Sequence, residues 1–437
     1  MSESRSAPWE PSLLRRVLRG VAGHRQIMSN VAWQTVAQLV ARLLNLAVFV
    51  LVANVLGASG LGRFLFAITF AQAAAVLVDF GMHPILVREA VKDSAPGGPW
   101  PRAWSLFATF SRLKLLLAIG VGAAALLAAR FLFGYRGADA AGIALALAAI
   151  FCLSYLGLLF SLFRARQEMA YEALFTFLHR LAYLALALGA LALWRTANAV
   201  LAAYAAGGLL VAAATYAVVR ARYAVAGARP LPVNRALLGQ VAPLLLIDFW
   251  TLVYFRVDTL LLQWLKGYAE VGVYGAAYRL FEALIVVPSV LAIAFFPRLV
   301  RDVAVETSGR SVRRYFLLFL LVGIAGAALL YVLAGPLLAL LYGTGGEFAA
   351  STGIFRLLLV AFVVVCINYP LTQIAIASSR QKAYAFGVAA AGLVNVTLNL
   401  FDIPRYGAAG AAAVTIATEL ALLLFLRGQL VELWRRA

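Results

Sequence analysis

Residues 30–56 have the sequence NVAWQTVAQLVARLLNLAVFVLVANVL, and this stretch decides the fold. A helix needs about 20 apolar residues to cross a bilayer, and this one is longer, with Arg42 as its one charged residue. Stretches of the same kind continue along the chain, because hydrophobic residues make up 64% of the 437 positions and charged residues only 13%. Soluble domains carry far more charge. The composition therefore predicts an all-α integral membrane protein.

Hydropathy predicts twelve transmembrane helices. They are expected at residues 30–56, 62–87, 106–132, 139–164, 172–194, 198–220, 238–264, 270–297, 314–342, 352–378, 383–401 and 407–430. The N-terminal segment Leu13–Arg25 alternates Leu and Val with Arg, which predicts a short helix lying in the membrane interface.

The placement of Arg and Lys tests both the number of spans and their orientation. With twelve spans, 26 basic residues fall on the side of the two termini and 6 on the opposite side. Such an excess marks the cytoplasmic side, and an odd number of spans would destroy the alternation. We therefore expect a multi-pass membrane protein with both termini in the cytoplasm. The net charge of +19 then reflects contact with anionic headgroups and does not indicate nucleic acid.

The loops exclude several classes of function. Each is too short to fold as a domain, and none holds a Gly-rich phosphate loop followed by Lys and Ser or Thr. The three histidines are scattered and lack metal-ligand spacing. The sequence therefore predicts neither an enzyme nor a bound cofactor or metal, and it places the function inside the helix bundle.

The two halves of the chain resemble each other at an offset of 210 residues. The turn Leu56–Phe64 between the first two spans matches the turn Leu265–Tyr274 between spans seven and eight, with Gly62 opposite Gly272. Six plus six spans of the same orientation predict two parallel six-helix lobes around a central cavity. We expect an N-terminal lobe at 1–225, which includes the interfacial helix, and a C-terminal lobe at 226–437.

Polar residues within the spans are the candidates for the site. An arginine facing lipid costs several kcal/mol, about 2.5–3.5 on insertion scales, so arginines inside spans should face a cavity, water or a partner. The residues expected to line a substrate cavity are Arg42, Gln34, Gln38, Asn45, Arg180, Arg256 and Arg279. The acids considered for ion coupling are Asp258, Glu282 and Asp248.

Arg42 is the strongest of these candidates. Gln34, Gln38, Arg42 and Asn45 recur at helical spacing and form one polar stripe, which fits either a cavity wall or a buried hydrogen-bond network. Arg279 and Arg356 also have interpretations other than binding substrate.

Arg279 and Glu282, three residues apart, can neutralise each other. Arg356 lies about one turn into its span and can extend to the interface.

Several motifs along the whole chain resemble one family. These are Asn30 with Trp33, Leu56-Gly57-x4-Gly62-x-Phe64, Asp79-Phe80-Gly81 with Arg88, Asp258, Val271-Gly272-Val273-Tyr274-Gly275-Ala276-Ala277-Tyr278-Arg279, and Tyr406-Gly407-Ala408-Ala409-Gly410-Ala411-Ala412-Ala413 with Glu419. In this order they resemble the Wzx-type polysaccharide flippases of the multidrug/oligosaccharidyl-lipid/polysaccharide exporter superfamily. The superfamily's peptidoglycan-precursor flippases usually have fourteen spans and an early basic motif that is absent here.

The resemblance implies a function and partners. It implies a flippase that moves an undecaprenyl-diphosphate-linked oligosaccharide across the inner membrane by alternating access, as a monomer among membrane lipids, with a polysaccharide polymerase and ligase as further partners. Arginine suits this substrate because its guanidinium donors match phosphate oxygens. A cation-coupled drug or metabolite antiporter of the same superfamily is the alternative, since that branch also has twelve spans. A drug site for cations should hold carboxylates and aromatic residues instead.

Overall fold

The computed structural model describes residues 11–92, 100–231, 235–292, 295, 309–377 and 381–435. Within these ranges, side chains are described except at 11–38, 235–238, 240–243, 309–312, 376–377, 381–382 and 428–435. The described residues form helices and no strands. The helices are α1 Pro11–Asp79, α2 Met82–Lys92, α3 Pro101–Phe131, α4 Gly137–Ala165, α5 Met169–Leu193, α6 Ala197–Tyr223, α7 Arg235–Lys266, α8 Tyr268–Leu284, α10 Gly309–Tyr342, α11 Ser351–Ala377 and α12 Gln381–Arg435.

The twelve predicted spans are found in these helices. Nine described stretches are long and apolar enough to cross a membrane, and two of them, Leu39–Lys92 and Ala383–Arg427, contain a break that makes two crossings of each. The polar helix α7 supplies the remaining span. The prediction of an all-α membrane protein with twelve spans is therefore confirmed.

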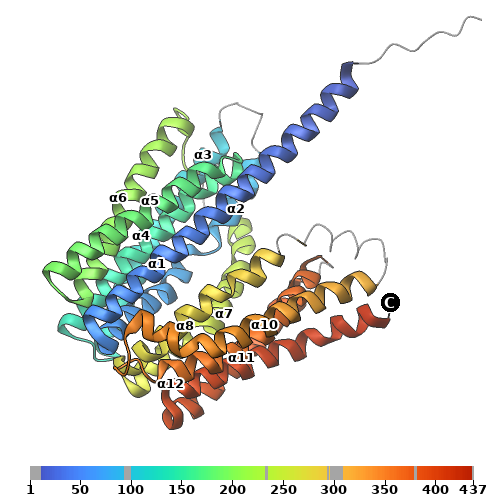
Figure 1. The fold of residues 1–437 in the computed structure, drawn as a ribbon. Coiled ribbons are helices and arrows are strands. Elements are labelled where there is room, and N and C mark those ends of the chain that lie inside the picture. The colour runs from blue at the N-terminus through green and yellow to red at the C-terminus, as the bar shows by residue number, and fades with distance from the viewer. Residues whose placement is uncertain are drawn as a thin grey trace, which may run out of the picture.

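The N-terminal segment differs from the expected interfacial helix. Its backbone continues without interruption into α1, which extends beyond the rest of the bundle in Figure 1. Between Pro11 and Gly57 no residue interrupts the helix, and no proline follows Pro11 there. Since proline is the strong helix breaker, nothing in this stretch obliges the helix to end before the first span.

Two glycines turn the long helices α1 and α12 back on themselves. Gly57 has φ 69° and Gly407 has φ 57°, a left-handed conformation that residues with a Cβ rarely adopt. At each break a carboxylate from another element caps the helix that follows. Glu347 accepts from the Ala58 amide at 2.5 Å, and Glu270 accepts from the Ala408 amide at 2.7 Å. A negative charge at a helix N-terminus is stabilising because the first amides there lack intrahelical partners.

The helices fall into two groups along the chain. In Figure 1 the blue-to-green helices α1–α6 lie on one side and the yellow-to-red helices α7–α12 on the other. Within the first group α1 packs on α4, α5 and α6, and within the second α12 packs on α7 and α11. The main contact between the groups is α1 against α8. The lobe boundary itself, near residue 225, stays a prediction.

The contact of α1 with α8 carries the 210-residue repeat. A Cβ on Gly62 would overlap the carbonyl oxygen of Tyr268, and a Cβ on Gly272 would overlap that of Ala58. The two contacts are equivalent in the repeat, because Gly272 lies 210 residues after Gly62 and Tyr268 lies 210 residues after Ala58. The turns before them also match, because Gly57 (φ 69°, ψ −172°) and Gly267 (φ 90°, ψ −178°) share one conformation. Matched glycines thus let two matched helices cross at backbone contact.

This crossing predicts an unusual effect of a helix-favouring substitution. Alanine normally stabilises a helix relative to glycine by about 1 kcal/mol. Gly272→Ala should instead lower stability by roughly 1–3 kcal/mol, because the added methyl meets backbone of Ala58 that cannot rotate away. The measurement is the thermal midpoint of the purified protein in detergent. Gly120→Ala is the matched control, since no atom lies within 4 Å of its Cβ position, and it should keep or raise the midpoint. An equal response of both variants would contradict the close crossing.

Candidate functional site

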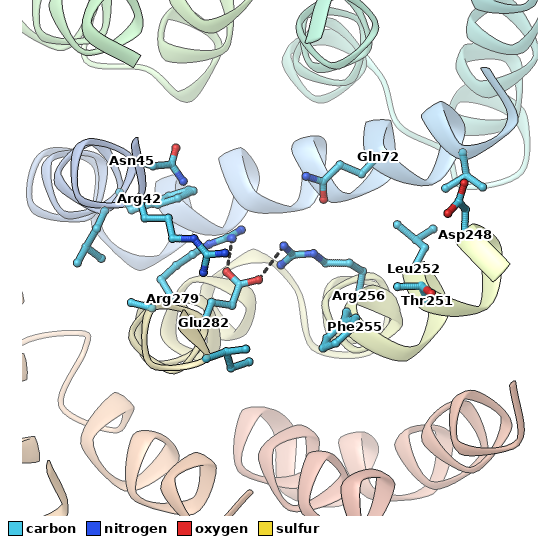
Figure 2. Close-up of a pocket in the computed structure, with 15 residues that line it drawn as sticks. Arg42, Asn45, Gln72, Asp248, Thr251, Leu252, Phe255, Arg256, Arg279 and Glu282 are labelled. Carbon is cyan, nitrogen blue, oxygen red and sulfur yellow. Dashed lines mark hydrogen bonds and ion pairs between the residues drawn. The ribbon is translucent and has the colours of Figure 1, made fainter. Parts of the chain in front are cut away.

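A cavity of about 600 Å³ lies between the two groups of helices. Its walls come from α1, α7 and α8, and Figure 2 shows the side chains of these helices directed into it. The lining residues are Arg42, Asn45, Leu46, Phe49, Gln72, Val76, Asp248, Thr251, Leu252, Phe255, Arg256, Arg279, Glu282, Ala283 and Ile285. We call this space the arginine cavity. Its volume is typical of sites that bind small molecules or headgroups.

Two arginines of the cavity share one carboxylate. Arg256 on α7 contacts Glu282 Oε1 through Nη2 at 2.7 Å, and Arg279 on α8 contacts Glu282 Oε2 through Nη1 at 2.5 Å. The guanidinium of Arg279 also lies over the ring of Phe49, with 4.3 Å from its central carbon to the ring centroid. The sequence predicted the pair of Arg279 with Glu282. It did not predict the link from α7 to α8, because spacing within one helix does not show which helices are neighbours.

Arg42 adds a third guanidinium from α1. Figure 2 places it beside Arg279 and Glu282. Among the side chains that the structure describes, Arg42 has no hydrogen bond or ion pair, and its side chain is exposed to the cavity. The stripe partners Gln34 and Gln38 lie outside the described side chains. The charged lining residues therefore comprise three arginines and two acids, which leaves the described cavity wall with a positive charge.

The last described residue that was expected to line the cavity, Arg180, lies outside the lining and contacts one of its residues. Arg180 on α5 is not among the lining residues, and its Nη1 donates to Asn45 Oδ1 at 3.3 Å. Asn45 itself lines the cavity. Arg180 thus holds a lining residue in place rather than facing the space directly.

The three acids considered for ion coupling occupy different environments. Glu282 is bound to two arginines, as described above, and Asp248 lines the opposite end of the cavity with its side chain exposed (Figure 2). Asp258 is 4% exposed and is not among the residues that line the cavity; it accepts hydrogen bonds from the Tyr274 hydroxyl and from the Thr259 amide at 2.6 Å. The structure therefore brings Asp248 and Glu282 into one cavity and separates Asp258 from them.

A buried lysine of the N-terminal group was not expected from the sequence. Lys114 is one of the 26 basic residues that the sequence assigns to the side of the termini, but in α3 it is only 2% exposed. Its Nζ donates to Asp79 Oδ1 at 2.7 Å and to the Ser154 carbonyl at 2.9 Å, and it lies 2.8 Å from His83 Nε2. Asp79 thus connects the C-terminal end of α1 to α3 and α4, next to Phe80 and Gly81, which both have positive φ.

A second buried polar cluster lies in the C-terminal group. Glu419 on α12 is 5% exposed, and it accepts from the Tyr254 hydroxyl at 2.5 Å and from Asn368 Nδ2 at 2.8 Å. Asn395 donates to Thr418 at 3.0 Å, so it bridges the two halves of α12. Both clusters are built from residues on separate spans, which is why no local motif indicated them.

Arg356 and the two cysteines lie outside the arginine cavity, and Arg356 and Cys366 contact residues of α10. The guanidinium of Arg356 donates to the Tyr331 carbonyl at 3.3 Å and lies 5.0 Å from the centroid of its ring. Cys152 and Cys366 are free thiols, and the Cβ atom of Cys366 packs against Gly323. Among the described residues, no group of His, Cys, Asp or Glu is arranged to hold a metal ion.

Comparison with solved structures shows two kinds of transporter with this fold. The lipid II flippase MurJ in an inward closed conformation has a TM-score of 0.72 at 13% identity, and the match covers 92% of this chain and 87% of that one. A multidrug resistance MATE family transporter of the MOP superfamily, inward-facing, has a TM-score of 0.71 at 15% identity over 91% and 95% of the chains.

A MOP superfamily transporter from Pyrococcus furiosus, described as having a binding pocket of reverse polarity, has a TM-score of 0.61 at 15% identity over 93% and 96% of the chains. At such low identity these likenesses show the fold alone.

Sequence comparison gives the family. No curated protein matches the chain significantly. The family model for polysaccharide biosynthesis proteins matches residues 27–303, which is more than half of the chain. The match includes most of α1, all of α2 through α8, and every lining residue of the arginine cavity. The resemblance read from the motifs is thereby confirmed, and the chain belongs to the polysaccharide biosynthesis protein family.

Proposed function

We propose that this protein moves an undecaprenyl-diphosphate-linked oligosaccharide across the bacterial inner membrane for surface polysaccharide synthesis. The observation that carries the proposal is the convergence of Arg42, Arg256 and Arg279 in one cavity between the two groups of helices. A diphosphate cannot cross hydrocarbon unaided, and guanidinium groups provide permanently charged donors for its oxygens. Three such groups in the membrane interior are costly unless they face water, an acidic partner or a bound anion, and the one carboxylate of Glu282 cannot neutralise all three.

The proposed mechanism is alternating access. The lobes 1–225 and 226–437 rock about the arginine cavity, which holds the headgroup while the polyprenyl tail stays in the bilayer. With both termini in the cytoplasm, the Gly57 and Gly267 turns face the periplasm, and the close crossing of α1 with α8 near these turns closes the outer side. Such a carrier needs no catalytic residue, cofactor or nucleotide, and it works as a monomer. A polysaccharide polymerase and a ligase would use the exported product.

A cation-coupled drug or metabolite antiporter is the second candidate. The likeness in fold to the MATE transporter is as close as the likeness to MurJ, so the fold does not distinguish the two functions. The cavity charge does favour one of them. Of the two acids that line the cavity, Glu282 is occupied by two arginines, and only Asp248 faces the space without an ion pair among the described residues. A site for organic cations needs unpaired carboxylates, whereas this wall is positive.

The test is to follow the lipid-linked oligosaccharide in a strain that lacks the gene. We expect surface polysaccharide to disappear and the lipid-linked repeat unit to accumulate in the inner membrane on the cytoplasmic side, where it stays protected from a sugar oxidant added outside the cells. The gene supplied on a plasmid should restore both. Normal surface polysaccharide in the deletion strain, together with altered sensitivity to cationic drugs, would favour the antiporter.

A further inference from the structure

The double ion pair of Glu282 raises the question of what this carboxylate does in a cavity that must bind an anion. Each of its two oxygens contacts a different guanidinium, at 2.7 Å from Arg256 and 2.5 Å from Arg279. The three side chains are largely buried, with 27% of Glu282, 18% of Arg256 and 12% of Arg279 exposed. Figure 2 shows the carboxylate between the two arginines, toward the side where Arg42 lies.

The charges in this part of the cavity are unbalanced. One carboxylate faces two guanidinium groups, and Arg42 adds a third with no ion pair among the described side chains. Without Glu282 these cations would stand together with no opposite charge between them, and uncompensated buried charge is strongly unfavourable. Glu282 therefore lowers the electrostatic cost of the positive charges in the empty cavity, although it does not neutralise all of them.

Carboxylate and phosphate groups present similar acceptors to arginine. Both offer two oxygens in one plane to the N–H groups of a guanidinium, and both form charge-assisted hydrogen bonds with it. A diphosphate diester carries two negative charges, so it can satisfy Arg42 and at least one of the two arginines that Glu282 now occupies. An anion entering the cavity thus meets donors that already hold an internal anion of the same geometry.

We propose that Glu282 is a displaceable internal counter-ion: it neutralises Arg256 and Arg279 in the empty carrier and competes with the substrate's diphosphate for them. This rests on the proposed function and adds a role within it. The competition weakens substrate binding, but it also helps to expel the substrate after translocation. It then leaves the empty cavity with less charge for the return movement, since Glu282 replaces the departed anion.

A purely positioning role predicts the opposite sign. If Glu282 only held Arg256 and Arg279 in the right orientation for the substrate, then removing its charge would let both side chains move, and anion binding would weaken. If Glu282 competes, removing its charge strengthens binding. The direction of the change in affinity therefore distinguishes the two roles.

The experiment uses the purified full-length protein in detergent with geranylgeranyl diphosphate as the probe and geranylgeraniol as its uncharged counterpart. Glu282→Gln should bind the diphosphate about tenfold more tightly than wild type at low ionic strength, because one like charge is removed from the site. In cells the same variant should export less polysaccharide per molecule, because release and return are slowed. Glu168→Gln is the matched control, since Glu168 also pairs with an arginine, Arg222 at 3.2 Å, but outside the cavity. Its affinity should equal that of wild type.

Each outcome bears on the proposal. Equal or weaker diphosphate binding by Glu282→Gln overturns it and leaves the proposed function intact. Failure of wild type to prefer the diphosphate over geranylgeraniol contradicts the proposed function and the counter-ion role together. Where Glu282→Gln folds poorly alone, it is purified with the diphosphate present. Recovery of its thermal midpoint by the probe beyond the shift seen for wild type supports the proposal, and no recovery contradicts it.

Discussion

Replacing Arg42 with alanine is expected to abolish surface polysaccharide while the protein remains inserted and abundant. Loss of one partner from a buried charge-assisted contact costs about 2–5 kcal/mol, which is roughly 30-fold or more in affinity. Stability should change little, since Arg42 has no ion pair with the described side chains that its removal would leave unsatisfied. Arg42→Lys keeps the charge but loses the planar fork of donors, and it should restore export in part.

The measurement is export divided by protein abundance in a strain that lacks the native gene. Arg356→Ala is the control, because Arg356 contacts only the Tyr331 carbonyl and ring among the contacts described and lies away from the cavity. It should export normally. Abundance that falls in proportion to export would make Arg42 a structural residue. Normal export from Arg42→Ala would reject the cationic cavity and favour the antiporter, with Asp248, the lining acid without an ion pair among the described residues, as its ion carrier.

The sequence was sufficient to predict the helices, because the length and hydropathy that define a span are properties of that one segment. Apolar length and the alternation of basic loops predicted twelve spans, and the glycines at 57 and 407 were expected at or near span boundaries. The 210-residue repeat anticipated the matched turns, although not that Gly62 and Gly272 would face each other's backbone. The continuous N-terminal helix was missed, since amphipathic charge there suggested a separate interfacial segment.

The site was predictable only in part, because it depends on contacts between helices. Helical spacing placed Arg42 and Asn45 on one face, and both line the cavity. The same reasoning could not show that Arg256 meets Glu282 across α7 and α8, or that Asp258 turns to Tyr274 instead of the cavity. Lys114 was missed for a related reason, since a lysine near a span end is usually solvated.

A disulfide across the Gly57 end of the bundle is expected to stop transport. Glu347, in the turn after α10, caps the Ala58 amide of α1 at 2.5 Å, and Asn54 donates to the Leu341 carbonyl at 2.7 Å close by. These contacts join the two groups of helices at the end proposed to face the periplasm. If the lobes must separate there to release substrate, cysteines at Ala58 and Glu347, in protein with Cys152 and Cys366 replaced by alanine, should form a disulfide in the oxidising periplasm and hold the carrier closed.

Export should then fall to the level of the deletion strain and return when a membrane-impermeant reductant is added to the cells. The single-cysteine variants serve as controls, because each loses the same native side chain but forms no bridge, and they should retain much more export than the pair. The loss of the Glu347 cap alone costs about 1 kcal/mol, which is too little to abolish activity. Full export from the cross-linked pair would show that this end does not open during transport. A pair that stays reduced in intact cells but is oxidised after lysis would place the Gly57 end in the cytoplasm and reverse the proposed orientation.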